Sequence, residues 1–136
     1  RFNISLDEGV ELVLFALEKA WGGEIFVPKI PSYRILEVAE AVAPECEVEI
    51  VGIRPGEKLH EEMITPTDSI NTLDLGKHYV ILPSVPVWDK ADYMAKMDAK
   101  TVPFGFHYRS DNNESFMSVE ELRAEIRIHV DPEFNA

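Results

Sequence analysis

The stretch "SLDEGVELVLFALEKAWGGEIFVP", residues 5–28, predicts a complete helix followed by a short strand. Ser5 and Glu8 have the spacing of a capping box, and acidic residues in the first turn suit the positive end of a helix dipole. Gly22 and Gly23 are expected to end the helix before the strand begins. Five apolar residues follow helical spacing and predict one buried face: Val10, Val13, Leu14, Leu17 and Trp21.

The neighbouring segments extend this pattern. Residues 1–5 alternate like a strand, Ser32 can cap a second helix, and "CEVEIVGI", residues 46–53, indicates a further strand with Val48 and Ile50 on one face. The second helix is expected to bury four apolar residues: Ile35, Leu36, Ala39 and Val42. A succession of strand, helix, strand, helix, strand predicts an α/β fold with a parallel or mixed sheet and crossover helices.

The second half of the chain is less regular. Residues 79–82 indicate one short strand, residues 88–97 a short helix, and residues 102–116 an extended segment with an Asp-Asn-Asn turn. Ser118 and Glu121 form a second capping box, which predicts a last helix to about residue 129. Two apolar residues of this helix are expected to be buried: Leu122 and Ile126.

Length and charge limit the possible functions. With 136 residues the chain is expected to form a single domain, residues 1–136. Because the strand-like alternation begins at the first residue, the chain is expected to be part of a larger fold. A net charge of −12, from 25 acidic and 13 basic side chains, disfavours binding to nucleic acid or to an anionic membrane. No apolar run is long enough to span a bilayer, and no signal peptide is evident. A single cysteine, Cys46, excludes an internal disulfide and fits a cytoplasmic location.

The common catalytic and cofactor patterns are missing from this sequence. His60 opens "HEEMI", but position 64, where a zinc-protease helix has its second histidine, is Ile. The glycine pair 22–23 follows a helix rather than a strand, so it is not a nucleotide cradle. Lys96 follows Tyr93 by three residues, whereas a Tyr-Lys pair on one helix face needs four. We therefore expect no catalytic, metal-binding or cofactor-binding residue in this chain.

The segment "GIRPGEKLHE", residues 52–61, is the strongest candidate for ligand binding. Pro55 disfavours helical geometry at Arg54, and Gly56 permits a sharp turn that brings Glu57 to the same rim. A guanidinium suits a diphosphate, and a carboxylate three residues later suits the hydroxyls of a ribose. The turn is therefore either a nucleotide-diphosphate clamp or a Pro-Gly surface turn carrying an Arg-Glu ion pair, worth under about 1 kcal/mol.

Three segments carry a resemblance to a known family: "RFNISLDEGVELVLFALEKAWGGEIFVPKIPS", residues 1–32, "ECEVEIVGIRPGEKLHEEMI", residues 45–64, and "FHYRSDNNESFMSVEELR", residues 106–123. They resemble the C-terminal portion of the UDP-N-acetylglucosamine 4,6-dehydratases, which belong to the extended short-chain dehydrogenase/reductase superfamily. The inverting type, which begins pseudaminic acid biosynthesis for surface glycans, is the most similar. The motif "IRPGEKLHE" is a specific signature of this family and its capsule-sugar relatives.

The resemblance implies a mixed strand-helix, substrate-binding part of the extended short-chain dehydrogenase fold that lacks the Rossmann domain. By resemblance, Arg54 contacts the diphosphate of a UDP-sugar and Glu57 the ribose, while Arg1 lies near the substrate. Residues 29–32 either line the same cleft or only lead into the next helix. The parent enzyme uses NADP to oxidise C4, eliminates water across C5 and C6, returns the hydride to C6 and inverts C5. The residues for that chemistry lie upstream in the family, so this chain alone is expected to be inactive.

Two other interpretations remain open. One is a fragment of a capsule-type UDP-GlcNAc dehydratase that also epimerises C5, and the other is a non-enzymatic binding or assembly module that keeps the fold. In each case the surface facing the Rossmann domain would be exposed, and exposed apolar patches favour association. The sequence therefore predicts self-association of the isolated chain.

Overall fold

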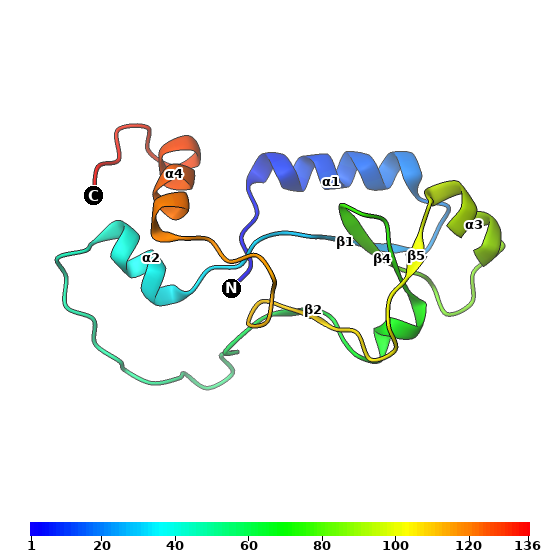
Figure 1. Ribbon diagram of the computed structural model, residues 1–136, viewed down its shortest axis with the longest axis horizontal. Helices are drawn as coiled ribbons and strands as arrows, with labels where there is room; N and C mark the ends of the chain where they lie inside the picture. Colours follow the sequence, from blue (N-terminus) through cyan, green and yellow to red (C-terminus); the bar gives the residue numbers. More distant parts are fainter. The chain divides into compact units, whose positions relative to one another are not determined.

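The computed structural model describes all 136 residues and divides into two compact units, each built from segments that are far apart in the sequence (Figure 1). Unit 1 comprises Arg1–Asn3, Ile30–Glu61 and Ser110–Ala136, and unit 2 comprises Ile4–Lys29 and Glu62–Arg109. The prediction that residues 1–136 form one domain stays a prediction. No helix combines the length and hydropathy that a bilayer crossing requires.

Unit 2 is built on a small antiparallel sheet. Four strands lie in the order β1-β4-β3-β5, with Val27 opposite Tyr79 and Leu73 opposite Val80. A second sheet pairs β2 with β6, also antiparallel. The strands of unit 2 are β1 (Ile25–Pro28), β2 (Glu62–Ile64), β3 (Thr72–Asp74), β4 (His78–Ile81), β5 (Lys100–Thr101) and β6 (Tyr108–Arg109).

The predicted parallel or mixed sheet with crossover helices is therefore wrong. The connection between β3 and β4 is a turn of three residues, with Gly76 at φ 85°. So short a connection reverses the chain and joins only antiparallel neighbours, whereas parallel strands need a crossover of a dozen or more residues. The mixed α/β class itself is confirmed, since helices and strands both contribute to the chain.

Helices and aromatic side chains complete unit 2. It contains α1 (Leu6–Lys19), a short 3-10 helix η1 (Asp68–Asn71) and α3 (Lys90–Met97). The core of the sheet is formed by Leu73, Val80, Leu82 and Tyr93, with Phe26 and Trp88 packed against it. The predicted strand at residues 79–82 and the predicted short helix at residues 88–97 are both confirmed, within one or two residues.

The start of α1 agrees with the prediction, but its buried face does not. The Ser5–Glu8 capping box forms, and the helix ends at Lys19 with the extended Ala20 as its C-cap, before the predicted glycine stop at Gly22 and Gly23. The ring of Phe15 packs against Phe26 and stacks on His78. The residues predicted to be buried are instead exposed in this chain: Val10, Val13, Leu14, Leu17 and Trp21. The helix is apolar on more than one face, and spacing alone does not show which face the sheet covers.

Unit 1 is held together by two packed helices, α2 (Ile35–Val42) and α4 (Val119–His129). Ala41, Met117 and Leu122 form their buried contact. The predicted capping box of α4 forms, and Ile126 is half-buried. In α2 the predicted cap and face are wrong, because the N-cap residue is Arg34 and three residues expected inside are exposed: Ile35, Leu36 and Val42. Ser32 is instead fully buried, where it bridges Phe2 and Phe116.

Two predicted strands, at residues 1–5 and 46–53, do not form. Residues 46–53 have the composition of a strand, but no segment of the chain pairs with them, and Ile50 is 89% exposed. A strand needs a hydrogen-bonded neighbour, which β propensity alone does not supply. Residues 1–5 form a single bridge, between Phe2 and Ser32, rather than a strand. In Figure 1 the chain between α2 and β2 is correspondingly drawn without helix or strand.

Candidate functional site

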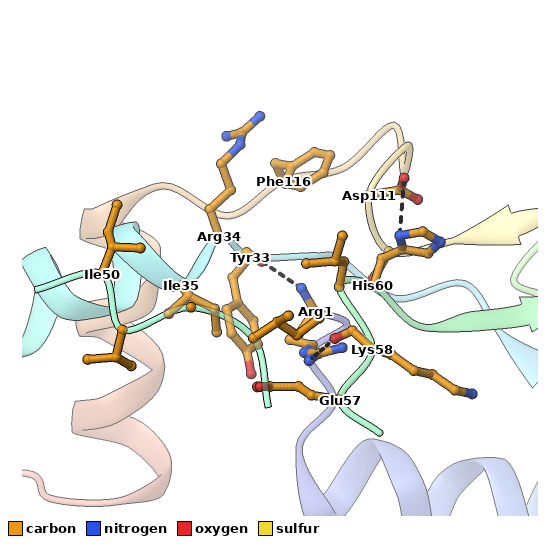
Figure 2. A pocket seen from close by; sticks show the side chains of 15 residues that line it. Arg1, Tyr33, Arg34, Ile35, Ile50, Glu57, Lys58, His60, Asp111 and Phe116 are labelled. Atoms are coloured by element: carbon orange, nitrogen blue, oxygen red, sulfur yellow. Dashed lines mark hydrogen bonds and ion pairs between the residues drawn. The ribbon is translucent and has the colours of Figure 1, made fainter. Parts of the chain in front are cut away.

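A pocket of about 620 Å³ lies within unit 1. Three parts of the chain line it: the first residue with residues 33–35 at the start of α2, residues 50–53 with 57–60, and the segment that holds Ser110, Asp111 and Phe116 (Figure 2). Isoleucine, leucine and aromatic side chains make up much of the wall, with a few charged groups among them. This combination, and a volume within the usual range of roughly 300–1,000 Å³, is typical of small-molecule sites.

The predicted turn forms at residues 54–57. The backbone N–H of Glu57 donates to the Arg54 carbonyl at 3.0 Å, and Gly56 has φ 80°. This is the geometry of a turn with Pro55 at its second position and a left-handed glycine at its third. The Glu57 carboxylate accepts a hydrogen bond from the Arg54 backbone N–H at 3.0 Å, which closes the turn from the other side. The turn is therefore well defined by its own backbone.

The side chains of Arg54 and Glu57 have different surroundings. Glu57 lines the pocket, whereas Arg54 is not among the lining residues and makes no ion pair within the chain. The Arg54–Glu57 surface ion pair, one of the two interpretations of the turn, is thus not formed, because the carboxylate binds backbone instead. The structure leaves the Arg54 guanidinium exposed and without a partner in the chain.

Arg1 also lines the pocket, but its guanidinium is occupied. Nη1 donates to Oε1 of Glu61 at 2.6 Å, and Nη2 donates to the backbone carbonyl of Lys58 at 2.5 Å. The backbone of Arg1 pairs with Tyr33, whose N–H donates to the Arg1 carbonyl at 2.8 Å. Figure 2 shows the Arg1 guanidinium beside the backbone of Lys58, whose own ammonium is directed away from it.

Further charged and aromatic groups line the pocket. The Arg34 guanidinium lies 4.4 Å from the centre of the Phe116 ring and pairs with Glu37 outside the pocket. Nδ1 of His60 lies 3.6 Å from a carboxylate oxygen of Asp111. The motif "IRPGEKLHE" contains His60 and so pointed to it, whereas no local signal marks Phe116, which comes from a distant part of the chain.

The suggestion that residues 29–32 line the cleft is not supported. Lys29 pairs with Asp74 at 2.6 Å and lies over the Tyr79 ring, all within unit 2. Ser32 is fully buried and receives a hydrogen bond from the Asn113 amide at 3.1 Å. The lining residues begin immediately after this segment.

Comparison with known proteins adds the family to this geometry. Residues 1–83 match the model of a family described as "Polysaccharide biosynthesis protein". The chain belongs to this family. Its resemblance to the inverting UDP-N-acetylglucosamine 4,6-dehydratases is confirmed as well: it is 45% identical to that enzyme of Campylobacter jejuni over 126 residues. The aligned part covers 90% of this chain and 38% of the Campylobacter protein.

Other relatives extend the comparison. The chain is 36% identical to a UDP-glucose 4-epimerase of Rickettsia canadensis over 127 residues, again 90% of this chain and 37% of that protein. Among solved structures, Pen from Bacillus thuringiensis matches with a TM-score of 0.74 and 30% identity, over 93% of this chain and 37% of that one. This likeness confirms the predicted fold class, a part of the short-chain dehydrogenase/reductase fold. The chain thus spans less than two-fifths of the length of these relatives.

Proposed function

We propose that this chain is the UDP-sugar-binding C-terminal part of a UDP-N-acetylglucosamine 4,6-dehydratase of the C5-inverting type. In this proposal the full-length protein acts in surface-glycan, pseudaminic acid biosynthesis in the cytoplasm, and the isolated chain is inactive. The observation that carries the proposal is the Arg-Pro-Gly-Glu turn, which directs Glu57 into a pocket of about 620 Å³ and leaves Arg54 free of partners. The family and the dehydratase relatives support it.

The residues of the proposed site have different chemical roles. Glu57 accepts hydrogen bonds from the ribose hydroxyls, while the Arg54 guanidinium binds the diphosphate with its planar set of donors. Arg1 lies in the wall of the same pocket and is proposed as the third residue of the substrate site. Arg54 is outside the wall, so its side chain reaches the phosphates at the mouth of the pocket rather than at its base.

The distribution of charge supports an anionic ligand. The chain has almost twice as many acidic as basic side chains, 25 against 13. In the pocket the balance is reversed, since Arg1, Arg34 and Lys58 line it against the carboxylates of Glu57 and Asp111. Two of these cations are paired with carboxylates outside the wall, Arg1 with Glu61 and Arg34 with Glu37, so the charge of the pocket is a minor argument beside the turn.

The NADP of the proposed full-length enzyme does not fit the residues of this chain. A dinucleotide site needs a strand that leads through a glycine-rich turn into a helix N-terminus. Here the segment between β1 and α2 contains no glycine, and every strand pair in the chain is antiparallel. We therefore assign the cofactor and the chemical steps to the remaining, Rossmann part of the full-length protein.

A capsule-type dehydratase that also epimerises C5 is the second candidate. The UDP-glucose 4-epimerases of several Rickettsia species are 30–36% identical to this chain, which favours a wider group of UDP-sugar enzymes. Identification of the product that the full-length protein forms from UDP-N-acetylglucosamine distinguishes both dehydratases from a binding module. A product inverted at C5 with C4 oxidised supports a dehydratase of either type. A non-enzymatic binding module predicts that no product forms and that Arg54 and Glu57 are dispensable.

The test of the proposed site is calorimetric titration of UDP into the chain. We expect Arg54→Ala to abolish measurable binding and Glu57→Gln to weaken it about tenfold, as for the loss of a charge-assisted hydrogen bond. Arg127→Ala is the matched control, because it removes an arginine from unit 1 that does not line the pocket. Equal affinity of Arg54→Ala and the wild type would rule out the clamp. If the wild type does not bind, the same variants are compared in the full-length protein.

A further inference from the structure

The segment that carries the Arg-Pro-Gly-Glu turn is almost detached from the rest of its unit. We call residues 47–59 the pocket loop. Every residue of this loop is exposed, so apolar burial does not hold it in place. Its internal hydrogen bonds join Arg54 and Glu57 only. The single hydrogen bond that reaches the loop from outside is the one from the Arg1 guanidinium to the Lys58 carbonyl.

Arg1 is itself held by hydrogen bonds to other parts of unit 1. The Asn3 N–H donates to the Pro31 carbonyl and the Tyr33 N–H to the Arg1 carbonyl, both at 2.8 Å. The carboxylate that receives the other arm of the guanidinium belongs to Glu61, whose backbone N–H donates to Oγ of Ser110 at 2.9 Å. The Ser110 N–H donates back to the Glu61 carbonyl, also at 2.9 Å, and Ser110 is 1% exposed.

The Arg1 guanidinium therefore connects Glu61, which is hydrogen-bonded to the buried Ser110, to the exposed pocket loop at Lys58. A planar guanidinium donates to two acceptors at once in a fixed geometry, whereas a lysine ammonium is a compact point charge without this fork. Lys58 directly follows Glu57, so a hydrogen bond to the Lys58 carbonyl restrains the backbone next to Glu57, the residue proposed to contact the ribose. We propose that Arg1 is a positioning residue, which holds the pocket loop so that Glu57 faces the pocket.

The consequence for UDP rests on the proposed function. If Arg54 and Glu57 bind UDP, a loop that is already ordered binds more tightly than one that must be ordered on binding. Arg1 then acts on affinity through the loop rather than through a direct contact with phosphate. The two arms of the guanidinium donate to Glu61 and to the Lys58 carbonyl. A lysine ammonium lacks this planar fork, so substitution by lysine is not expected to restore the effect of Arg1.

Amide hydrogen exchange tests the restraint without any ligand. The probe is the Glu57 N–H, which is bonded to the Arg54 carbonyl inside the loop. We expect Arg1→Ala and Arg1→Lys to speed its exchange about tenfold, since local opening becomes easier, while the amides of α4 stay unchanged and show that the fold is intact. Arg127→Ala serves as the control and leaves the loop amide unchanged. Unaltered exchange of Glu57 in a folded Arg1→Ala variant would overturn the proposal.

Titration with UDP separates this proposal from the proposed function. We expect both Arg1 variants to weaken UDP binding to a similar degree, about tenfold, as for loss of preorganisation. Wild-type affinity in Arg1→Lys, with the loop amide released, would mean that a positive charge beside the ligand matters and would overturn the positioning role. If UDP fails to bind or Arg54→Ala has no effect, the proposed function fails, and the exchange experiment still decides the role of Arg1.

Discussion

At the scale of single residues, Tyr93 combines tight packing with an unpaired polar group. Its ring is fully buried, stacked on Trp88 at 4.8 Å between centroids and edge-on to Trp21 at 5.2 Å. The hydroxyl has no hydrogen-bond partner in the chain. Burial, together with the charge of Glu24, raises the pKa of Tyr93 to about 12, so the phenol stays neutral across the ordinary pH range. The ring stabilises unit 2, while its hydroxyl opposes folding.

We expect Tyr93→Phe to keep the fold and to raise the free energy of unfolding by up to about 1 kcal/mol, because it removes a desolvated hydroxyl without changing the ring. Urea denaturation followed by tryptophan fluorescence measures this change. The contrast is Tyr93→Ala, which leaves a cavity and should cost about 3–5 kcal/mol. A loss of more than about 1 kcal/mol in Tyr93→Phe would reveal a hydrogen bond to the hydroxyl and contradict the expectation.

His78 makes the stability of unit 2 depend on pH. Its ring stacks on Phe15 at 4.5 Å. Burial, and then the charges of Lys77 and Lys29, lower the pKa of His78 below the reference value of 6.5. Below pH 6.5 the unfolded chain therefore takes up a proton at this site before the folded chain does. The free energy of unfolding falls as the pH drops through this range, until the folded-state pKa is passed.

We expect the urea midpoint of the wild type to fall between about pH 7.5 and about pH 5.5, and His78→Phe to reduce the size of this fall, since the variant keeps a stacked ring without a titrating group. His129→Gln is the matched control, because it removes a histidine at the end of α4 in unit 1. The same pH dependence in wild type and His78→Phe would show that His78 does not contribute.

At the scale of secondary-structure elements, α4 depends on its N-terminal cap. Oγ of Ser118 accepts a hydrogen bond from the Glu121 N–H at 3.2 Å, and the Glu121 carboxylate accepts one from the Ser118 N–H at 2.7 Å. The bond from the Ser118 N–H, and then a bond of 2.9 Å that the Ser118 hydroxyl donates to the same carboxylate, lower the pKa of Glu121 below 4.5. The contribution of the cap is therefore present above pH 4.5 and is lost as the pH falls through the lowered pKa.

Ser118→Ala should lower the free energy of unfolding by about 1 kcal/mol, since it removes the side-chain acceptor for an orphan N–H of the helix. Chemical denaturation at neutral pH measures the loss. Ser84→Ala is the matched control, because Ser84 is exposed and lies outside helices and strands, and it should change stability very little. If both variants are equally stable, α4 does not need its cap.

At the scale of the whole molecule, α1 carries an exposed apolar face. Leu14 and Leu17 are 60% and 77% exposed, and Leu6, Val10 and Val13 lie beside them on the same helix without cover from the chain. Contiguous apolar surface of this kind favours association. We therefore keep self-association of the isolated chain as a proposal and assign it to this helix face, with a second copy of the chain as the partner.

Sedimentation velocity at increasing concentration tests this assignment. We expect the wild type to sediment faster as the concentration rises, and Leu14→Glu with Leu17→Glu to shift the chain toward monomer, because two charges make burial of the face unfavourable. The matched control is the pair Val85→Glu and Val87→Glu, which adds the same charge at exposed loop positions of the same unit. A wild type that remains a clean monomer at high concentration would rule out the proposal.

The sequence by itself determined the features that depend on neighbouring residues. The capping boxes at Ser5 and Ser118 and the turn at residues 54–57 form as predicted. In each case the hydrogen bonds join residues two to four positions apart, so the local sequence contains both partners. The family motif likewise indicated Glu57, which lines the pocket.

Only the tertiary structure decided which surfaces meet. The antiparallel order of the sheet, the exposed face of α1 and the unpaired residues 46–53 depend on segments that are distant in the sequence. The same holds for Arg1, whose guanidinium contacts a carbonyl 57 positions away and a carboxylate 60 positions away. Periodicity shows that one face of a helix is apolar, and a charge shows that a side chain can form an ion pair. Which segment covers that face or supplies the opposite charge depends on the packing of the whole chain, which no local pattern contains.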